Sequence, residues 1–258
     1  MTAPTVITST RNPRVQAARG LHRARERRAQ QRHLVEGPRA VREALEAGVV
    51  EEVFVAESAA GTDLGHPVVQ AADHVLVADH VLVHLAEATT PQGIVAVART
   101  VTATLDAIGA GTVVVLDEVA DPGNAGTILR TADALGAAGV VLTTGSVDAF
   151  APKTVRAAVG STYHLPIVTD VSLAEVAAAA RASGRLLVGL DAAGSGSLDV
   201  LAGRDGALCL VLGNEAHGLP PDHVDLLDVT VAIPLHPRAE SLNVAAAAAI
   251  AIHAATRS

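Results

Sequence analysis

Aromatic residues are almost absent from this sequence of 258 residues, which contains two phenylalanines, one tyrosine and no tryptophan. Proteins that bind single-stranded nucleic acid by stacking its bases need several exposed aromatic rings, so we do not expect that mode of binding here. The single cysteine, Cys209, lies in an apolar run and predicts a buried small side chain rather than a nucleophile. One cysteine also excludes an internal disulfide and a cysteine-based zinc site.

Long apolar stretches and several familiar motifs are missing as well. No segment approaches the ~20 apolar residues of a membrane-spanning helix, and the start of the sequence lacks the apolar core of a secretion signal. We therefore expect a cytoplasmic protein with no membrane partner. The sequence contains neither a P-loop nor a G-x-G-x-x-G motif, and its 11 histidines show no H-E-x-x-H spacing, so no metal site is expected.

Positive charge is concentrated at one end of the sequence. Residues 1–42 contain ten arginines, no lysine and two glutamates, a net charge of +8, whereas the whole chain carries −8. Residues 43–258 therefore carry −16. A basic element attached to an acidic body is typical of a protein that binds RNA or DNA through the basic element. A solvated basic helix is the alternative interpretation of the same charges.

The hydrophobic pattern of the first hundred residues predicts a small α/β domain. Apolar runs alternate with amphipathic segments, and Gly37-Pro38 and Gly48 mark the start and the end of one helix. We expect strands at 33–36, 53–56, 75–77 and 94–98, and helices at 38–47, 67–73 and 80–87. The weakly patterned segment 101–111 is interpreted as a linker, which assigns residues 1–100 to this domain.

The remaining residues, 112–258, predict a second α/β domain. Its strands are almost wholly apolar and are expected at 113–116, 139–142, 166–168, 186–190, 208–212 and 229–233. Such strands are buried on both faces, so we expect a mostly parallel sheet covered by helices. The helices are expected at 126–135, 153–159, 173–182 and 242–256. The glycine-serine run at 194–197 is interpreted as a flexible loop.

Three clusters of polar residues and glycines lie at the ends of these strands, at the edge where open α/β sheets bind ligands. The first cluster is DPGNAGTILRTA at 121–132. Asn124 is expected to cap a helix, and Gly126 and Arg130 are expected to share one face of it. An arginine next to a glycine is suited to bind a phosphate with two hydrogen bonds, and a surface salt bridge is the alternative interpretation.

The other two clusters follow later strands. In VLGNEAHGLP at 211–220, the glycines leave backbone N–H and C=O groups free for an adenosine-like ligand, and Glu215 adds a carboxylate, although a simple turn has the same composition. In VAIPLHPRAESLNV at 231–244, a strand leads through a proline-bounded loop into the last helix. Ser241 is expected to cap that helix.

Taken together, the three clusters resemble the motifs of the SpoU (TrmH-like) branch of the SPOUT family of RNA 2′-O-ribose methyltransferases. The family pattern N-x-G-x-x-x-R-[ST]-A matches residues 124–132, and its G-x-E-x-x-G element matches residues 213–218. Its I-P and S-L-N-V elements match residues 233–234 and 241–244. Segments 9–13, 34–44 and 91–97 resemble the substrate-binding domain of the same family. The resemblance therefore covers nearly the whole chain.

This resemblance implies a trefoil-knotted C-terminal domain that binds S-adenosylmethionine, releases S-adenosylhomocysteine, needs no metal and forms a homodimer. The N-terminal domain is implied to resemble certain RNA-binding ribosomal proteins. Carried over residue by residue, the cofactor-binding positions are Leu212, Gly213, Asn214, Ile233 and Leu242. The catalytic positions are Arg130, Asn124, Glu215, Ser241 and Asn243.

The resemblance also implies an RNA substrate, which we expect to be 23S ribosomal RNA. Arg130 would hold the phosphate of the target nucleotide next to the ribose 2′-hydroxyl. The other RNA-binding positions are expected to be Arg11, Arg14, Arg19 and Arg39. Two alternatives are a methyltransferase of the same chemistry that acts on transfer RNA and a catalytically silent RNA-binding protein of the same fold.

Overall fold

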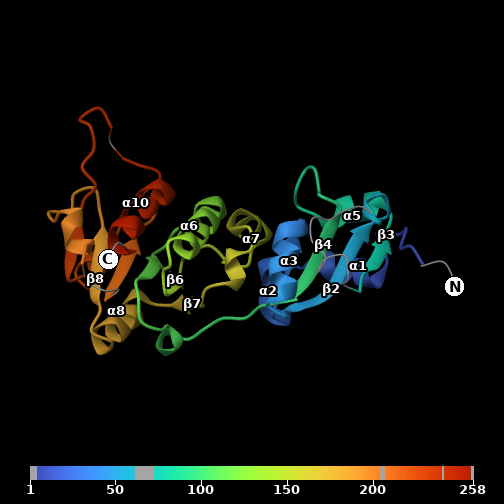
Figure 1. Cartoon of the computed structure of the whole chain (residues 1–258), viewed down its shortest axis with the longest axis horizontal. Helices are drawn as coiled ribbons and strands as arrows, with labels where there is room; N and C mark the ends of the chain where they lie inside the picture. The colour runs from blue at the N-terminus through green and yellow to red at the C-terminus, as the bar shows by residue number, and fades with distance from the viewer. Residues whose placement is uncertain (1–4, 62–72, 204–206, 240, 257–258) are drawn as a thin grey trace. The chain divides into compact units, whose positions relative to one another are not determined.

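The computed structural model describes residues 5–61, 73–203, 207–239 and 241–256 (Figure 1). The chain divides into two compact units. Unit 1 consists of Met1–Val101 and Phe150–Tyr163, and unit 2 consists of Thr102–Ala149 and His164–Ser258. The chain therefore passes between the units three times. The sequence pattern places residues 150–163 in the second domain, and in the structure this segment belongs to unit 1.

Unit 1 contains a four-stranded mixed sheet in the order β1-β4-β2-β3. The strands are β1 (Arg32–Glu36), β2 (Val50–Ala56), β3 (Val75–Val77) and β4 (Ile94–Arg99). β4 is antiparallel to both β1 and β2, and β2 is parallel to β3. All four predicted strands are confirmed. Of the predicted helices, 38–47 and 80–87 correspond to α3 (Pro38–Glu46) and α5 (Asp79–Leu85), and 67–73 lies, except for Asp73, outside the described residues.

The two faces of this sheet are covered by different helices because side chains alternate along each strand. Leu34, Phe54 and Val95 face the core formed with α1 (Pro13–Gly20) and α5. Val35, Val53 and Val55 face the core formed with α3 and α7 (Pro152–Ala158). α7 is the part of unit 1 that comes from the second half of the chain. Its Arg156 is 3.0 Å from Glu87 and 3.8 Å from Glu36.

Two helices in the basic segment were not predicted: α1 and α2 (Ala24–Gln30). Their abundant arginines hide the apolar periodicity, because α1 buries only small or short side chains, Val15, Ala18 and Gly20. A local signal for α1 was present. The side chain of Asn12 accepts a hydrogen bond from the backbone N–H of Arg14 at 3.0 Å, and Pro13 occupies the first helical turn.

Unit 2 contains a six-stranded sheet in the order β10-β8-β9-β5-β6-β7, and every pair of neighbours is parallel. The strands are β5 (Val113–Leu116), β6 (Gly139–Thr143), β7 (Ile167–Val171), β8 (Leu186–Leu190), β9 (Leu208–Leu212) and β10 (Val229–Val231). The expected α/β architecture with a mostly parallel sheet is confirmed. β10 ends two residues earlier than predicted, so Ile233 lies in the segment that follows the strand.

Helices cover both faces of this sheet (Figure 1). On one face α8 (Leu173–Ala182) packs its Leu173, Val176 and Ala177 into a core with strand residues that include Cys209. On the other face α6 (Pro122–Ala134) packs against α10 (Val244–Thr256). Cys209 is 3% exposed, as predicted, and its burial raises the pKa of its thiol to about 11. No helix among the described residues is long and apolar enough to cross a membrane.

The glycine-serine run that follows β8 is a loop, as predicted, and its Gly196 forms an isolated bridge to Val231 of β10. The N–H of Gly196 donates to the carbonyl of Thr230 at 3.0 Å, and the N–H of Ala232 donates to the carbonyl of Gly196 at 3.1 Å. At Gly194 a Cβ atom would lie 2.6 Å from the carbonyl carbon of Val231. Glycine is required here because the run lies directly against the backbone of β10.

Candidate functional site

The carboxyl ends of β5 and β9 form the candidate site. The two strands are neighbours in the middle of the sheet, with β6 and β7 on one side and β8 and β10 on the other. Open α/β sheets bind ligands at such a reversal of strand order. A cavity of about 390 Å³ opens beside the end of β9, within the range of roughly 300–1,000 Å³ typical of ligand pockets.

All five residues predicted to bind a cofactor line this one cavity: Leu212, Gly213, Asn214, Ile233 and Leu242. Glu215 and Ser241, predicted as catalytic residues, line it as well. The loop after β9 doubles back on itself, since Asn214 and Gly218 exchange two backbone hydrogen bonds of 3.0 and 2.9 Å. A Cβ atom at Gly213 would lie 2.5 Å from the carbonyl carbon of Gly218, so this close approach requires glycine.

Sequence reasoning missed the contribution of β8 to the cavity. Leu190, Asp191 and Ala192, at the carboxyl end of this strand, are lining residues. Asp191 carried a usable signal, because it is a polar residue directly after an apolar strand. What the pattern lacked was the strand order, which makes β8 the neighbour of β9. Leu235, Val244 and Ala247 of the later segment were also missed.

Glu215 joins the second cluster to the first. Its carboxylate accepts hydrogen bonds from the backbone N–H groups of Ala120 (3.0 Å) and Asp121 (3.1 Å) and from the side-chain amide of Asn124 (3.0 Å). Partial burial of the carboxyl group raises its pKa, but these hydrogen bonds outweigh that effect and hold the pKa of Glu215 below its ordinary value. Glu215 is therefore a carboxylate at neutral pH.

Asn124 joins the first cluster to the third. Its side-chain oxygen accepts a hydrogen bond of 3.0 Å from the side-chain amide of Asn243. Glu215, Asn124 and Asn243 therefore form one hydrogen-bonded chain, although they lie far apart in the sequence. The sequence predicted that these three residues belong to one site, and the structure shows how they meet.

Both capping predictions were wrong. Asp121, not Asn124, caps α6, because its side chain accepts a hydrogen bond from the backbone N–H of Asn124 at 2.8 Å. Asn124 lies in the first turn instead, which frees its amide for Glu215 and Asn243. At the last helix Asn243, not Ser241, accepts from the backbone N–H of Ala245 at 2.9 Å. Ser241 is exposed and lines the cavity.

Arg130 lies further along α6 and is exposed. Among the hydrogen bonds and ion pairs of the described residues, none involves its guanidinium group, so it is not part of the Glu215–Asn124–Asn243 chain. The surface salt bridge that was the alternative interpretation is thus not formed within the described part of the chain. An exposed guanidinium of this kind is available to an anionic ligand.

The identity of the chain follows from comparison with known proteins. Residues 111–253, more than half of the sequence, match the model of the SpoU rRNA methylase family. The chain belongs to the SpoU rRNA methylase family. Residues 12–96 match a second model, the MRM3-like substrate-binding domain.

Known RNA methyltransferases resemble this chain over nearly its full length. The 23S rRNA (guanosine(2553)-2′-O)-methyltransferase RlmP of Bacillus subtilis is 34% identical over 248 residues, which cover 96% of this chain and 97% of the relative. The SpoU methyltransferase AviRb of Streptomyces viridochromogenes, solved in complex with the cofactor AdoMet, has a TM-score of 0.85 and 32% identity and covers 95% of this chain and 97% of its own. An AdoMet-bound rRNA methyltransferase of Sinorhizobium meliloti has a TM-score of 0.85 and 30% identity, with 97% coverage of both chains.

The arginines predicted to bind RNA differ in their surroundings. Arg11 and Arg39 are exposed, and Arg19 is half-buried at the end of α1. Arg14 forms an ion pair with Glu52 at 2.5 Å, so part of its charge is already compensated. Arg27, in the same basic segment, is 6% exposed and donates to the carbonyls of Leu21 and His22. The basic segment therefore contains both structural and accessible arginines.

Within the ranges that the structure describes, no group of three or more histidine, cysteine, aspartate or glutamate side chains could hold a metal ion.

Proposed function

We propose that this SpoU family protein transfers a methyl group from S-adenosylmethionine to a ribose 2′-hydroxyl of 23S ribosomal RNA. The observation that supports this most strongly is the hydrogen-bonded chain Glu215–Asn124–Asn243 beside the cavity, since it joins the three clusters whose motifs define the resemblance. The names of the relatives support the same reaction, because RlmP is a 23S rRNA 2′-O-methyltransferase.

The cavity fits S-adenosylmethionine in size and in chemistry. It combines apolar side chains such as Leu212 and Leu242 with the exposed backbone of the glycine-containing loop and the carboxylates of Asp191 and Glu215. Apolar groups suit an adenine ring, backbone groups suit its hydrogen-bonding edge, and carboxylates suit a cationic ligand. The five predicted residues would hold the cofactor, which supplies an electrophilic methyl group on a positively charged sulfur.

Arg130 is proposed to bind the phosphate of the target nucleotide and to orient the 2′-hydroxyl. A guanidinium group keeps its proton up to about pH 12, so its part is positioning rather than proton removal. Glu215 is a carboxylate, but it already accepts three hydrogen bonds from the start of α6. We therefore assign Glu215, with Asn124 and Asn243, to holding the site's loops in place. Ser241 is proposed to contact the ligand directly, since it is exposed at the cavity.

The two parts of the chain are proposed to divide the work. Unit 1 would bind the RNA through Arg11, Arg39 and the neighbouring arginines, and unit 2 would hold the cofactor and perform the transfer. The match of residues 12–96 to a substrate-binding domain supports the first assignment. The trefoil knot expected from the resemblance stays a prediction.

We further propose that the protein acts as a cytoplasmic homodimer. α10 supports the homodimer part of this proposal, because its exposed residues Ala246 and Ile250 lie four positions apart on one face of the helix, where the small alanine lets a second copy approach closely.

The proposal is tested by mapping 2′-O-methylated riboses in RNA from cells with and without the gene. We expect one or a few sites in 23S ribosomal RNA to lose the methyl group in the deletion strain and to regain it with the purified protein and S-adenosylmethionine. Loss of a site in transfer RNA instead would favour the transfer RNA enzyme. Unchanged methylation, together with RNA binding by the purified protein, would favour the silent RNA-binding protein.

A further inference from the structure

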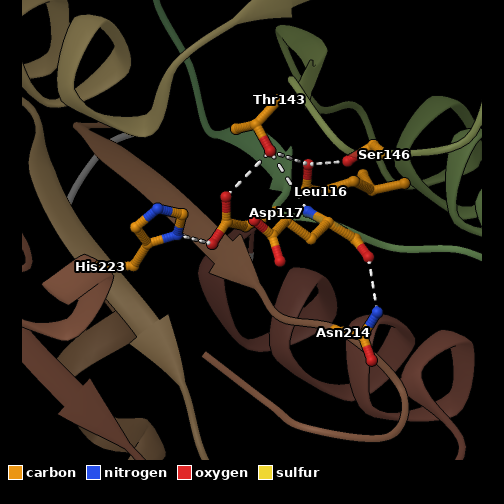
Figure 2. Close-up of polar contacts among 7 residues, drawn as sticks. Leu116, Asp117, Thr143, Ser146, Asn214 and His223 are labelled. Carbon is orange, nitrogen blue, oxygen red and sulfur yellow. Dashed lines mark hydrogen bonds and ion pairs between the residues drawn. The ribbon is translucent and has the colours of Figure 1, made fainter. Parts of the chain in front are cut away.

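The near end of the cavity loop, residues 213–220, is fastened to the end of β5 (Figure 2). The backbone N–H of Asp117 donates to the carbonyl of Leu212 at 2.8 Å. The side-chain amide of Asn214 donates to the carbonyl of Glu118 at 2.8 Å. Because Asn214 lines the cavity, the backbone of residues 117–118 sets where this part of the cavity wall lies.

The far end of the same loop returns to the same strand end. α9 (Pro221–Val224) begins directly after the loop and carries His223, whose Nδ1 is 2.7 Å from the Asp117 carboxylate (Figure 2). The Asp117 side chain is fully buried and that of His223 is 24% exposed. Loss of His223 would leave one oxygen of this buried carboxylate without a hydrogen-bond partner, which is costly, so this contact holds α9 in place.

Thr143 connects the two fastenings. Its hydroxyl donates to the second oxygen of Asp117 at 2.9 Å and accepts from the backbone N–H of Glu118 at 3.2 Å. Glu118 has a φ of 57°, a left-handed conformation that a glutamate adopts only when its surroundings hold it there. Through Thr143, the Asp117 carboxylate thus supports the turn at Glu118, whose backbone carbonyl accepts the hydrogen bond from the side-chain amide of Asn214.

We propose that Asp117 and His223 are positioning residues that clamp the cofactor loop at both ends and so pre-organise the cofactor cavity. The inference rests on the proposed function, which makes this cavity the S-adenosylmethionine site. Asp117 and His223 themselves do not line the cavity. Loss of the clamp should therefore weaken cofactor binding, because the loop must then become ordered on binding, and should leave the rate at saturating cofactor almost unchanged.

The clamp also gives cofactor binding a pH dependence with a definite sign. Burial lowers the pKa of His223, but the hydrogen bond and charge of Asp117, with the charges of Asp222 and Glu118, raise it above the ordinary value of 6.5. The ion pair is complete below pH 6.5 and weakens as the pH rises through the raised pKa. Cofactor affinity should fall over that upper range.

The test is calorimetric titration of S-adenosylmethionine into the full-length wild-type protein, His223→Gln, Asp117→Asn and Thr143→Val, with methyl-transfer kinetics on the same samples. We expect His223→Gln to raise the Kd and the KM for the cofactor about tenfold near pH 6, with kcat changed less than about twofold, and to abolish the pH dependence of the Kd. Asp117→Asn and Thr143→Val should weaken binding in the same direction.

The matched control is His164→Gln. His164 forms a similar pair with Asp133, at 2.8 Å, neither residue lines the cavity, and loss of the pair should leave the Kd unchanged. An equal Kd and an equal pH profile for wild type and His223→Gln would overturn the clamp while leaving the proposed function intact. A wild-type protein that binds no S-adenosylmethionine would overturn the proposed function and the clamp with it.

Discussion

At the scale of single residues, Glu215 links the loop after β9 to the start of α6 in the candidate site. It lies in the loop after β9, yet all three side-chain hydrogen bonds described for it come from the first turn of α6 and the residues before it. A carboxylate at that position is also favoured by the positive end of the helix dipole. The charge of Glu215 therefore stabilises the contact between two segments that are distant in sequence.

Replacement Glu215→Gln should lower both activity and stability. The amide offers one acceptor oxygen instead of two and turns a donor toward other donors, so we expect at least a tenfold loss of methyl transfer and a loss of about 1 kcal/mol in the free energy of unfolding. Because the pKa of Glu215 is lowered, its contribution is present above the ordinary value of 4.5 and is lost as the pH falls through the lowered pKa. Denaturant unfolding at about pH 7 and about pH 3 measures this, and an equal pH effect in wild type and variant would contradict it.

Arg130 makes a different kind of prediction, because it contributes to the ligand rather than to the fold. Arg130→Ala should abolish methyl transfer and leave both the unfolding free energy and cofactor binding as in wild type. Arg130→Lys should restore only a small part of the activity, since an ammonium group cannot bind a phosphate in the planar two-bond geometry. Methylation assays and calorimetry on the same samples test this prediction. Retained methylation by Arg130→Ala would show that Arg130 does not have the proposed role.

At the scale of elements, the sequence predicted the strands well and their neighbours not at all. Wholly apolar runs such as 208–212 are unambiguous, because a strand buried on both faces has nothing polar in it. Strand order, by contrast, depends on pairings between distant segments, so the sequence pattern could not place β8 beside β9 and Asp191 at the cavity. Helix caps were misassigned by two or three residues, because Asp121 and Asn124 are both good caps and only the backbone conformation decides between them.

The close pairing of residues 194–196 with β10 gives a prediction for an element boundary. Gly194→Ala should lower the free energy of unfolding by roughly 1–3 kcal/mol, because the added Cβ would lie 2.6 Å from a backbone carbon that cannot move freely. Gly109→Ala is the control, since nothing lies within 4 Å of a Cβ atom at that position. Thermal unfolding of both variants measures the difference, and equal stabilities would show that the run is free to move away from β10.

At the scale of the whole molecule, the charge is divided between a basic N-terminal segment and an acidic remainder. If the basic segment binds RNA phosphates, removing two accessible arginines with Arg11→Gln and Arg39→Gln should reduce the slope of log K against log salt by roughly 1.5. Arg181→Gln, an exposed arginine of unit 2, is the control and should not change the slope. Filter binding of an rRNA fragment over a range of salt concentrations measures this slope. Equal slopes for wild type and the double variant would show that these two arginines do not contact RNA phosphates.

The three passages of the chain between its units also bear on how this protein and its relatives diverge. Unit 1 is assembled from two separate stretches of sequence, so Val155 and Tyr163 pack into a core whose other residues precede position 101. A recombination event that exchanged only the first stretch would leave the second stretch facing a foreign sheet. Substitutions in α7 should therefore be matched by substitutions in its partner strand β1, and residues 1–101 of this chain do not contain the whole of unit 1.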